Sequence, residues 1–414
     1  MPLSKLLKLK KLSVLRKKQL LDDHRVCVPG NTIVWGNPDV VEIASLPERF
    51  ERQYSGEMIT VKPKYFEAVE FTPDHPILAY HAKLRKCSRQ NRRCLPIYVE
   101  CKSCKHRGET DFIPAKNLDE TRDALLVPAE NHGSLSKDED LLFLAGLYLA
   151  EGFTTTKWGV RFCFGKHEAD LATAVDARLK KLFGHAYIRT TRKDLWVECY
   201  SKEAITFFER FGRTSHEKHL PEEEMSLDRV STETLLRAYL LGDGWTSGRY
   251  TCCFTVSRKL ALQIQRLLLR SGMLASLYFV DKTYGFAYTS GGYELSWVER
   301  PKRPRRTHNG YYYISFSKST SQKTLVVYNI STPSGTYNVP FVVHNCHAWW
   351  SMLKKGRRMK LKSGEKVTKE LVAKRHKLIV EKLFEIGFCH HMRDSLDLTL
   401  PKRLIKESLE CSRR

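Results

Sequence analysis

An internal repeat is the feature that most constrains this sequence. Between residues 140 and 290 the order of an apolar helix, a strand, a second helix and a further apolar run occurs twice. Each copy opens with a helix that ends in an acidic residue and a glycine, at Glu151-Gly152 and at Asp243-Gly244. One such helix can recur by chance, but a whole unit does not. Two copies of one α/β unit are therefore expected to pack against each other.

The hydrophobic periodicity sets the expected boundaries inside each copy. Behind the first acidic helix we predict a strand over Val160–Phe164 and a helix over Asp170–Phe183. Behind the second we predict a strand over Tyr250–Val256 and a helix over Lys259–Arg270.

Small residues occupy the acidic helices where they would cross. They are Ala145 and Gly146 in the first helix and Ala238 and Gly242 in the second. Because small side chains let two helices pack closely, Glu151 and Asp243 are expected to lie together at the helix ends. Two adjacent carboxylates can hold a divalent metal against phosphate groups and activate water, so both acids are candidate catalytic residues and metal ligands.

The segments 144–152 (LAGLYLAEG) and 238–244 (AYLLGDG) resemble the paired LAGLIDADG motifs of homing endonucleases. The resemblance implies a monomeric, Mg²⁺-dependent enzyme that cuts double-stranded DNA at a specific site. The family also uses a lysine near each metal site, for which Lys323 is a candidate, with a solvated strand-end lysine as the alternative. Candidates for phosphate or base contacts are Arg161, Lys166, Arg189, Arg192, Arg249 and Lys282.

Regions of alternating polarity flank the repeat and predict strands, at residues 27–80 and again from Tyr311 to Val343. Three short motifs lie in or beside them. The motifs are Cys27-Val28-Pro29-Gly30, Thr72-Pro73-Asp74-His75 and His344-Asn345-Cys346. They supply two thiols, a hydroxyl, two imidazoles and a carboxamide that can cyclise onto its own backbone.

In this order the three motifs resemble the splice junctions and the internal Thr-x-x-His block of an intein, the self-excising protein element. The resemblance implies that Cys27 attacks the Val26 carbonyl, assisted by Thr72 and His75. Cys346 then takes over the acyl group, and Asn345 cyclises with His344 as proton donor. Two positions depart from the family, because Asn329 and Tyr337 stand where many relatives have Asp and His.

Four cysteines form a possible zinc site in a basic insert over residues 81–108. Cys87, Cys94, Cys101 and Cys104 follow the spacing C-x6-C-x6-C-x2-C, and four thiolates can close a tetrahedral Zn²⁺ site. Reduced, unbound thiols are the alternative.

Net charge is unevenly distributed. Of the total of +24, residues 1–26 carry +6 and residues 346–414 carry +10, so these basic and mainly helical flanks differ from the middle. Irregular cysteine spacing, the lack of a secretory leader and the lack of a long apolar run predict a cytoplasmic protein that does not span a membrane.

We therefore expect a β-rich Hint-type splicing domain with an α/β endonuclease inserted into it. The expected parts are an N-terminal host segment over 1–26, the splicing domain over 27–135 and 322–345, the endonuclease over 136–321 and a C-terminal host segment over 346–414. The alternative is a stand-alone nucleic-acid-binding protein, or an intron maturase, of LAGLIDADG ancestry without splicing.

Overall fold

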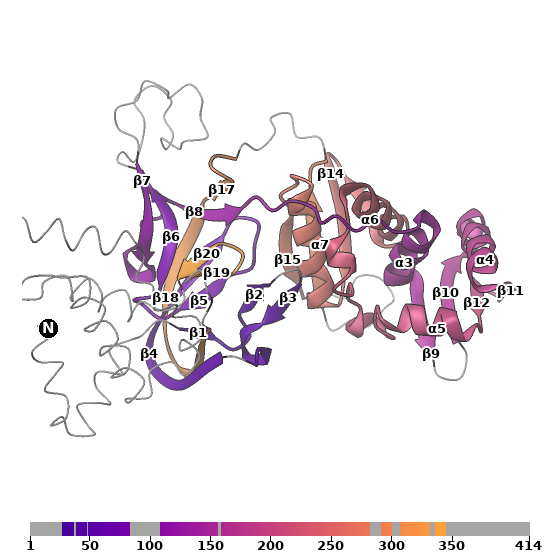
Figure 1. Ribbon diagram of the computed structural model, residues 1–414, viewed down its shortest axis with the longest axis horizontal. Coiled ribbons are helices and arrows are strands. Elements are labelled where there is room, and N and C mark those ends of the chain that lie inside the picture. The colour runs from indigo at the N-terminus through magenta and orange to yellow at the C-terminus, as the bar shows by residue number, and fades with distance from the viewer. Residues whose placement is uncertain are drawn as a thin grey trace, which may run out of the picture.

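The structure is a computed structural model, and it describes residues 27–36, 39–47, 49–82, 108–155, 159–281, 291–299, 307–330, 332 and 336–344. The predicted helical flanks and the four cysteines of the predicted zinc insert lie outside these residues. Figure 1 shows two parts. We call the described residues of 27–129 and 307–344 the β-rich part, and those of 133–299 the two-repeat part.

Two long strands hold the β-rich part together. They pair antiparallel over their whole length, from Arg49 opposite Ile330 to Pro63 opposite Phe316. Buried Ile59 and Val61 alternate with the more exposed Thr60 and Lys62, which is the pattern of a strand with one face on a core. Their sheet has the order β1 (Val28–Pro29), β18 (Phe316–Ile330), β4 (Arg49–Pro63), β5 (Val69–Phe71).

A second sheet in the same part combines strands from before and after the two-repeat part. Its order is β17 (Tyr311–Ile314), β8 (Asp123–Pro128), β6 (Pro76–His81), β20 (Val342–His344), β19 (Thr336–Asn338), with β7 (Glu109–Pro114) also paired to β6. A short ladder joins β2 (Ile33–Trp35) and β3 (Val40–Glu42), and two 3-10 turns are η2 (Ile43–Ser45) and η4 (Ala115–Asn117).

The strand pairing corrects the expected boundary between the two parts at 321/322. That boundary falls inside β18, whose first half pairs with β4, and β17 pairs with β8. Residues from Tyr311 onward therefore belong to the β-rich part, because a strand cannot be divided between two sheets without breaking its ladder.

The two-repeat part contains the same unit twice. The first copy is α3 (Glu139–Glu151), β9 (Gly152–Thr155), β10 (Gly159–Gly165), α4 (Ala169–Phe183), β11 (Tyr187–Thr190), β12 (Asp194–Cys199), followed by α5 (Lys202–Glu209). The second is α6 (Arg229–Asp243), β13 (Gly244–Ser247), β14 (Tyr250–Thr255), α7 (Arg258–Arg270), β15 (Ser276–Val280), β16 (Gly292–Trp297). Short 3-10 turns are η5 (Lys166–Glu168), η6 (Ser215–Glu217) and η7 (Glu224–Ser226).

Both sheets have the same strand order. It is β9-β10-β12-β11 in the first copy and β13-β14-β16-β15 in the second, antiparallel throughout. The predicted internal repeat is thus confirmed, and the predicted strands and helices agree with β10, α4, β14 and α7 to within one residue at each end. Among the described helices, none has the length and apolar character needed to cross a bilayer.

Helix α7 joins the two parts, and Figure 1 shows it beside β2 and β3. Residues Leu260 to Leu269 are buried on every side of this helix, including the polar Gln263 and Arg266. The Arg266 guanidinium forms a bidentate ion pair with the Glu130 carboxylate, with nitrogen–oxygen distances of 2.8 and 2.9 Å. Glu130 lies between the two parts, and Arg266 and Gln263 also donate to Asp39 of the β-rich part, at 2.9 and 2.7 Å, so the buried helix bonds directly to the other part.

Candidate functional site

Helices α3 and α6 cross through small residues. A Cβ atom on Gly146 would lie 2.4 Å from the Leu235 carbonyl oxygen and 2.7 Å from the Ala238 Cβ. A Cβ on Gly242 would lie 2.7 Å from the Ala150 Cβ. These distances are shorter than side-chain carbon contacts in proteins, so glycine permits this approach and a larger residue does not. The predicted close packing of the two helices is confirmed.

Both helices also begin at a defined residue. The Asp138 side chain accepts a hydrogen bond from the Leu141 backbone N–H at 3.1 Å, and Asp228 accepts one from Ser231 at 2.8 Å. Such N-caps satisfy amides that the helix leaves unpaired. With the start and the crossing of each helix determined, the positions of the acids at the other end follow.

Glu151 and Asp243 end the two helices side by side. The Glu151 Oε1 lies 3.1 Å from the position of a Cβ on Gly242, the residue before Asp243. Burial raises the pKa of Glu151 to about 7, and the charge of Glu168 adds to the effect. Burial raises the pKa of Asp243 to about 8, and the charge of Glu151 adds to it. A cation would relieve both the burial cost and the repulsion.

This donor set fits a small divalent cation. No group of three or more His, Cys, Asp or Glu side chains converges in the described part of the chain. The two carboxylates would therefore supply part of the coordination shell and leave the rest to water and phosphate oxygens, as Mg²⁺ prefers. Glycines 152 and 244 lead directly from the acids into β9 and β13, so the acids lie where the two sheets begin.

A buried lysine lies close enough to Asp243 to feel its charge. The Lys218 side chain is 3% exposed, and its Nζ donates to the Tyr148 carbonyl oxygen at 2.7 Å. Burial lowers the pKa of Lys218 to about 6, although the attraction of Asp243 opposes the shift. An amine with a pKa near neutrality can accept or deliver a proton beside the two carboxylates.

Sequence reasoning missed Lys218 and named Lys323 in its place. Lys323 lies on β18 in the β-rich part and forms an ion pair with Glu70 at 2.6 Å, so the structure does not bring it to the acids. No periodic spacing links Lys218 to either acid in the sequence. The signal that was available is its position between the two repeats, in the run Lys218-His219-Leu220-Pro221.

The predicted DNA-contact residues differ in their surroundings. Arg161 and Arg189 both approach the Glu198 carboxylate, at 3.0 and 3.3 Å, and both guanidinium groups lie over the Trp196 ring. Lys166, Arg192 and Arg249 are exposed, whereas Lys282 lies outside the described residues.

A second group of predicted residues gathers in the β-rich part, around Cys27. The Cys27 side chain is 7% exposed and Thr72 is fully buried. The Cys27 backbone N–H donates to the Thr72 Oγ1 at 2.9 Å, and the Thr72 hydroxyl donates to the Cys27 carbonyl oxygen at 3.2 Å. The nitrogen held in this way belongs to the peptide bond between residues 26 and 27.

His75 lies on the same buried turn. Its backbone N–H donates to the Thr72 carbonyl oxygen at 3.0 Å, and its ring packs edge-on against Tyr337 with 6.3 Å between ring centroids. Burial raises the pKa of Tyr337, and the nearby Cys27 thiol raises it further. Tyr337 therefore occupies a place beside both His75 and Cys27, although it lacks the acid-base range of an imidazole.

The C-terminal motif approaches the same turn. Val343 on β20 pairs with Ile77 on β6, two residues beyond His75, and the His344 ring packs edge-on against Phe112 at 5.3 Å. Asn345 and Cys346 lie outside the described residues. Asn329 is near the end of β18, where its side-chain oxygen accepts from the Ile330 N–H at 2.9 Å.

The zinc prediction concerns residues that the structure does not describe. Cys87, Cys94, Cys101 and Cys104 all lie outside the described residues, so a zinc site there stays a prediction. Of the other described cysteines, Cys199, Cys252 and Cys253 are buried free thiols and Cys163 is a half-buried one.

Comparison with protein families identifies a LAGLIDADG-like domain over residues 233–296. The chain thus contains a LAGLIDADG-like domain, as predicted for the second repeat, while the likeness of the β-rich part to a splicing domain stays a prediction. The ATP-dependent DNA helicase Hel308 of Thermococcus kodakarensis is 23% identical over 367 residues, covering 71% of this chain and 32% of the helicase. The chain spans about a third of that relative's length.

Two kinds of solved structure are also similar. The homing endonuclease I-DmoI in complex with DNA and Mn is 11% identical, covers 38% of this chain and 89% of its own, and superposes with a TM-score of 0.30. The N-terminal LAGLIDADG domain of DUF199/WhiA is 12% identical, covers 40% of this chain and 78% of its own, and has a TM-score of 0.26.

Proposed function

We propose that the two-repeat part is a metal-dependent, site-specific DNA endonuclease. The observation that carries this proposal is the convergence of Glu151 and Asp243 at the ends of two helices that cross through Gly146 and Gly242. The LAGLIDADG-like domain over residues 233–296 supports it. A purely structural helix pair has no need of two raised-pKa acids next to each other, because either acid would be more stable in water.

The chemistry follows from the residues. Glu151 and Asp243 would hold Mg²⁺, which when bound lowers the pKa of water and neutralises charge on the leaving oxygen. Each carboxylate would supply one protein ligand to the cation, at the point where its own sheet begins. Lys218 lies close to Asp243, where its amine can take a proton from the attacking water or stabilise the charge that develops on the phosphate.

The two copies are unequal in sequence, so the target should be a long duplex without two-fold symmetry. An element that copies itself must cut the allele that lacks it. The target we propose is therefore the uninterrupted host gene around the codons for Val26 and Cys346, a site that the insertion destroys.

Cleavage of that duplex is the test. In Mg²⁺ the chain should cut the joined site and spare the interrupted one. Glu151→Gln and Asp243→Asn should each abolish cutting, while Glu233→Gln, an exposed change on α6 that touches no acid of the pair, should not. If the wild type binds folded RNA and cuts no DNA under varied metal and salt, the protein is a nucleic-acid binder or maturase, and the endonuclease proposal is wrong.

We also propose that the chain splices itself, since a specific observation favours this second function. The Thr72 hydroxyl holds the Cys27 nitrogen in a buried turn, beside His75 and close to the strand that ends in His344. A buried backbone N–H needs an acceptor, and here that acceptor is a side-chain hydroxyl that also donates to the Cys27 carbonyl oxygen, so it orients the peptide group whose C–N bond splicing would break.

In the first step the Cys27 sulfur attacks the Val26 carbonyl carbon. A C–S bond forms, the C–N bond breaks, and the thiol proton passes to the Cys27 nitrogen, a transfer that we assign to His75. Cys346 then displaces the Cys27 thiolate. The Asn345 side-chain nitrogen attacks its own backbone carbonyl and releases the Cys346 amine, with His344 as proton donor. The acyl group then moves from the Cys346 sulfur to that amine, so the C–S bond breaks, an amide forms and the thiol regains its proton.

Intact mass of the freshly expressed chain tests this function. We expect a 319-residue product and a ligated 95-residue host, given the junctions at Cys27 and Asn345. Cys27→Ala should block the first step, and Asn345→Ala should leave the C-terminal segment attached. A wild-type precursor that stays full-length for hours at neutral pH would refute splicing. Accumulation of N-terminally cleaved chains would point to Asn329 and Tyr337, and Asn329→Asp with Tyr337→His should then restore ligation.

A further inference from the structure

The exposed face of the second repeat's sheet forms a hollow of about 1590 Å³. Strands β13, β14, β16 and β15 make its floor, and Lys64 and Tyr65 of the β-rich part stand at its rim. Because side chains two residues apart on a strand share a face, the register of the four strands assigns the floor residues to rows.

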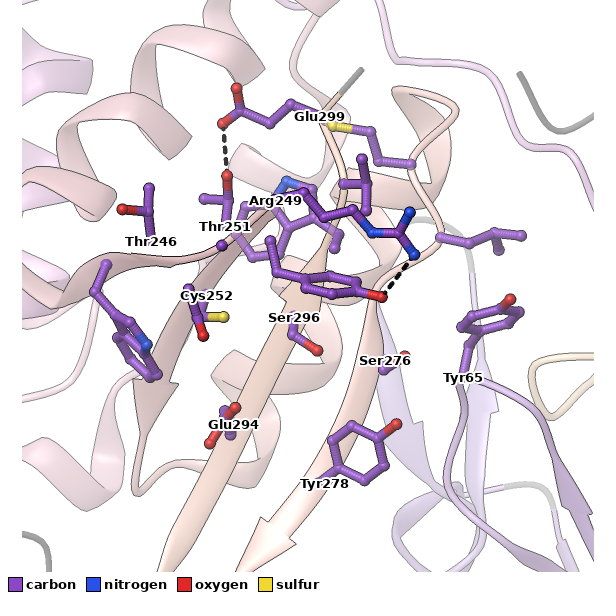
Figure 2. Close-up of a pocket in the computed structure, with 18 of the residues that line it drawn as sticks. Tyr65, Thr246, Arg249, Thr251, Cys252, Ser276, Tyr278, Glu294, Ser296 and Glu299 are labelled. Carbon is purple, nitrogen blue, oxygen red and sulfur yellow. Dashed lines mark hydrogen bonds between the residues drawn. The ribbon is translucent and has the colours of Figure 1, made fainter. Parts of the chain in front are cut away.

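Two rows are decisive. In one, Trp245, Cys252, Ser296 and Ser276 lie side by side across the four strands. In the next, Glu294 lies between Phe254 and Tyr278. Figure 2 shows Cys252, Ser296 and Ser276 in line, with Glu294 and Tyr278 one step farther along the strands. In strand order, Glu294 on β16 therefore lies between Trp245 on β13 and Tyr278 on β15, and Phe254 on β14 is its neighbour on the Trp245 side.

Aromatic rings dominate this face and are turned to solvent. Trp245 is 43% exposed, Tyr250 40% and Tyr278 55%. Large exposed aromatic side chains cost free energy unless they meet a partner, so a group of them on one face of a sheet marks a contact surface. Such rings meet thymine well, because its C5-methyl group is the apolar feature of the major groove.

The charges of the hollow are balanced, which is unusual for a face that meets DNA. Lys64 and Arg249 are offset by Glu294 and Glu299. Arg249 donates to the Tyr250 hydroxyl at 3.1 Å, and Glu299 accepts from Thr251 at 3.2 Å. The first repeat's sheet differs, since Arg161 and Arg189 there share Glu198.

Glu294 is the exception within the hollow. It makes no hydrogen bond or ion pair with another described residue, and it is partly buried among aromatic rings. The phosphate groups of DNA repel a nearby carboxylate, and a hydrogen bond donated by a base can offset that repulsion. Of the four bases, cytosine presents its amino group in the major groove, and Glu is the side chain that accepts from it.

We propose, on the basis of the endonuclease function proposed above, that the second repeat reads a half-site in which a cytosine lies between thymines. Tyr278 and Trp245 contact thymine methyl groups, and Glu294 accepts from the cytosine amino group. This assigns base composition to one half of the target.

The test begins with a bind-and-cut selection from randomised duplexes, with the expressed chain and Mg²⁺. The selected second half-site should contain cytosine between thymines. Replacing those thymines by deoxyuridine removes the methyl groups alone and should lower cutting about fourfold for each methyl in contact. The same replacement at thymines outside the selected site is the control and should have no effect.

Variants then assign the contacts. Tyr278→Ser should lose the response to deoxyuridine at one position, while Tyr278→Phe keeps it. Glu294→Gln should move the preference at one position from cytosine toward adenine, by about 5- to 100-fold, because Gln pairs with adenine. A selected site that is cut equally well with deoxyuridine, or a Glu294→Gln chain with unchanged preference, overturns this proposal alone. Selection of no DNA by the wild type overturns both proposals.

Discussion

Replacing Gly146 by alanine should separate the two acidic helices. The new Cβ would lie 2.4 Å from the Leu235 carbonyl oxygen, whereas ordinary contact begins at 3.4 Å, so the helices must part by about 1 Å at this point. The oxygen belongs to the backbone of α6 and cannot rotate away. Overpacking of this kind costs about 1–3 kcal/mol of the free energy of unfolding.

The same displacement acts on the acids. Moving a reacting group by about 1 Å lowers a rate on the order of 100-fold, so Gly146→Ala should cut DNA about 100 times more slowly than the wild type. Single-turnover cleavage and urea unfolding measure the two effects. Leu241→Ala, a 54% exposed change on α6, is the matched control and should alter neither.

A second substitution examines the cause. Adding Ala238→Gly removes the 2.7 Å contact but leaves the 2.4 Å contact with the backbone, so it should restore stability and cutting only in part. A Gly146→Ala chain that unfolds at the wild-type urea concentration and cuts within threefold of the wild-type rate would refute the argument that the glycine crossing positions the acids.

Five further predictions concern the acids, the lysine, the splicing turn and the contact between the two parts. Both raised acid pKa values mean that protons must leave before metal binds, so Mg²⁺ affinity and cutting should rise as pH rises through about 7 to 8, and calorimetry on Asp243→Asn should show a weaker dependence. An acid whose pKa is raised in the folded state lowers the free energy of unfolding as pH rises. The free energy of unfolding of the metal-free wild type, measured in urea, should therefore fall relative to that of Asp243→Asn between pH 4 and 8. Lys218→Met should fold and bind DNA but cut at least about 100-fold more slowly, with a cleavage–pH profile that lacks the wild-type inflection near 6. Thr72→Val should slow N-terminal cleavage by dithiothreitol about 10-fold, because the Cys27 nitrogen loses its acceptor, and equal rates would refute that role. Arg266→Ala should lower the free energy of unfolding by about 1–3 kcal/mol, because Glu130 keeps only Arg270 and the Asp39 carbonyl oxygen loses its donor, and an unchanged free energy of unfolding would show that this contact does not couple the two parts.

The two repeats were predictable because their signals are local. Helix and strand periodicities within about fifteen residues place β10, α4, β14 and α7, and the structure agrees with them closely. Recurrence of the whole unit then implied two copies in contact, and the small residues of α3 and α6 implied that Glu151 and Asp243 would meet.

The boundaries of the β-rich part could not be predicted from local sequence patterns. Residues 311–321 resemble any exposed strand, and their assignment depends on β18 pairing with β4 across more than 250 residues of intervening chain. No pattern within one segment carries the identity of so distant a partner, so the expected boundary at 322 fell inside a strand.

The site shows the same division. Cys27, Thr72, His75, Glu151 and Asp243 were recognisable by residue type and order, which the sequence determines by itself. Tertiary structure decided that Lys218 lies close to Asp243, that Tyr337 faces Cys27, and that Arg161 and Arg189 share Glu198. The reason is physical, because burial and the approach of charges from distant segments arise only when the chain has folded, and these set both the pKa values and which charged groups stay exposed.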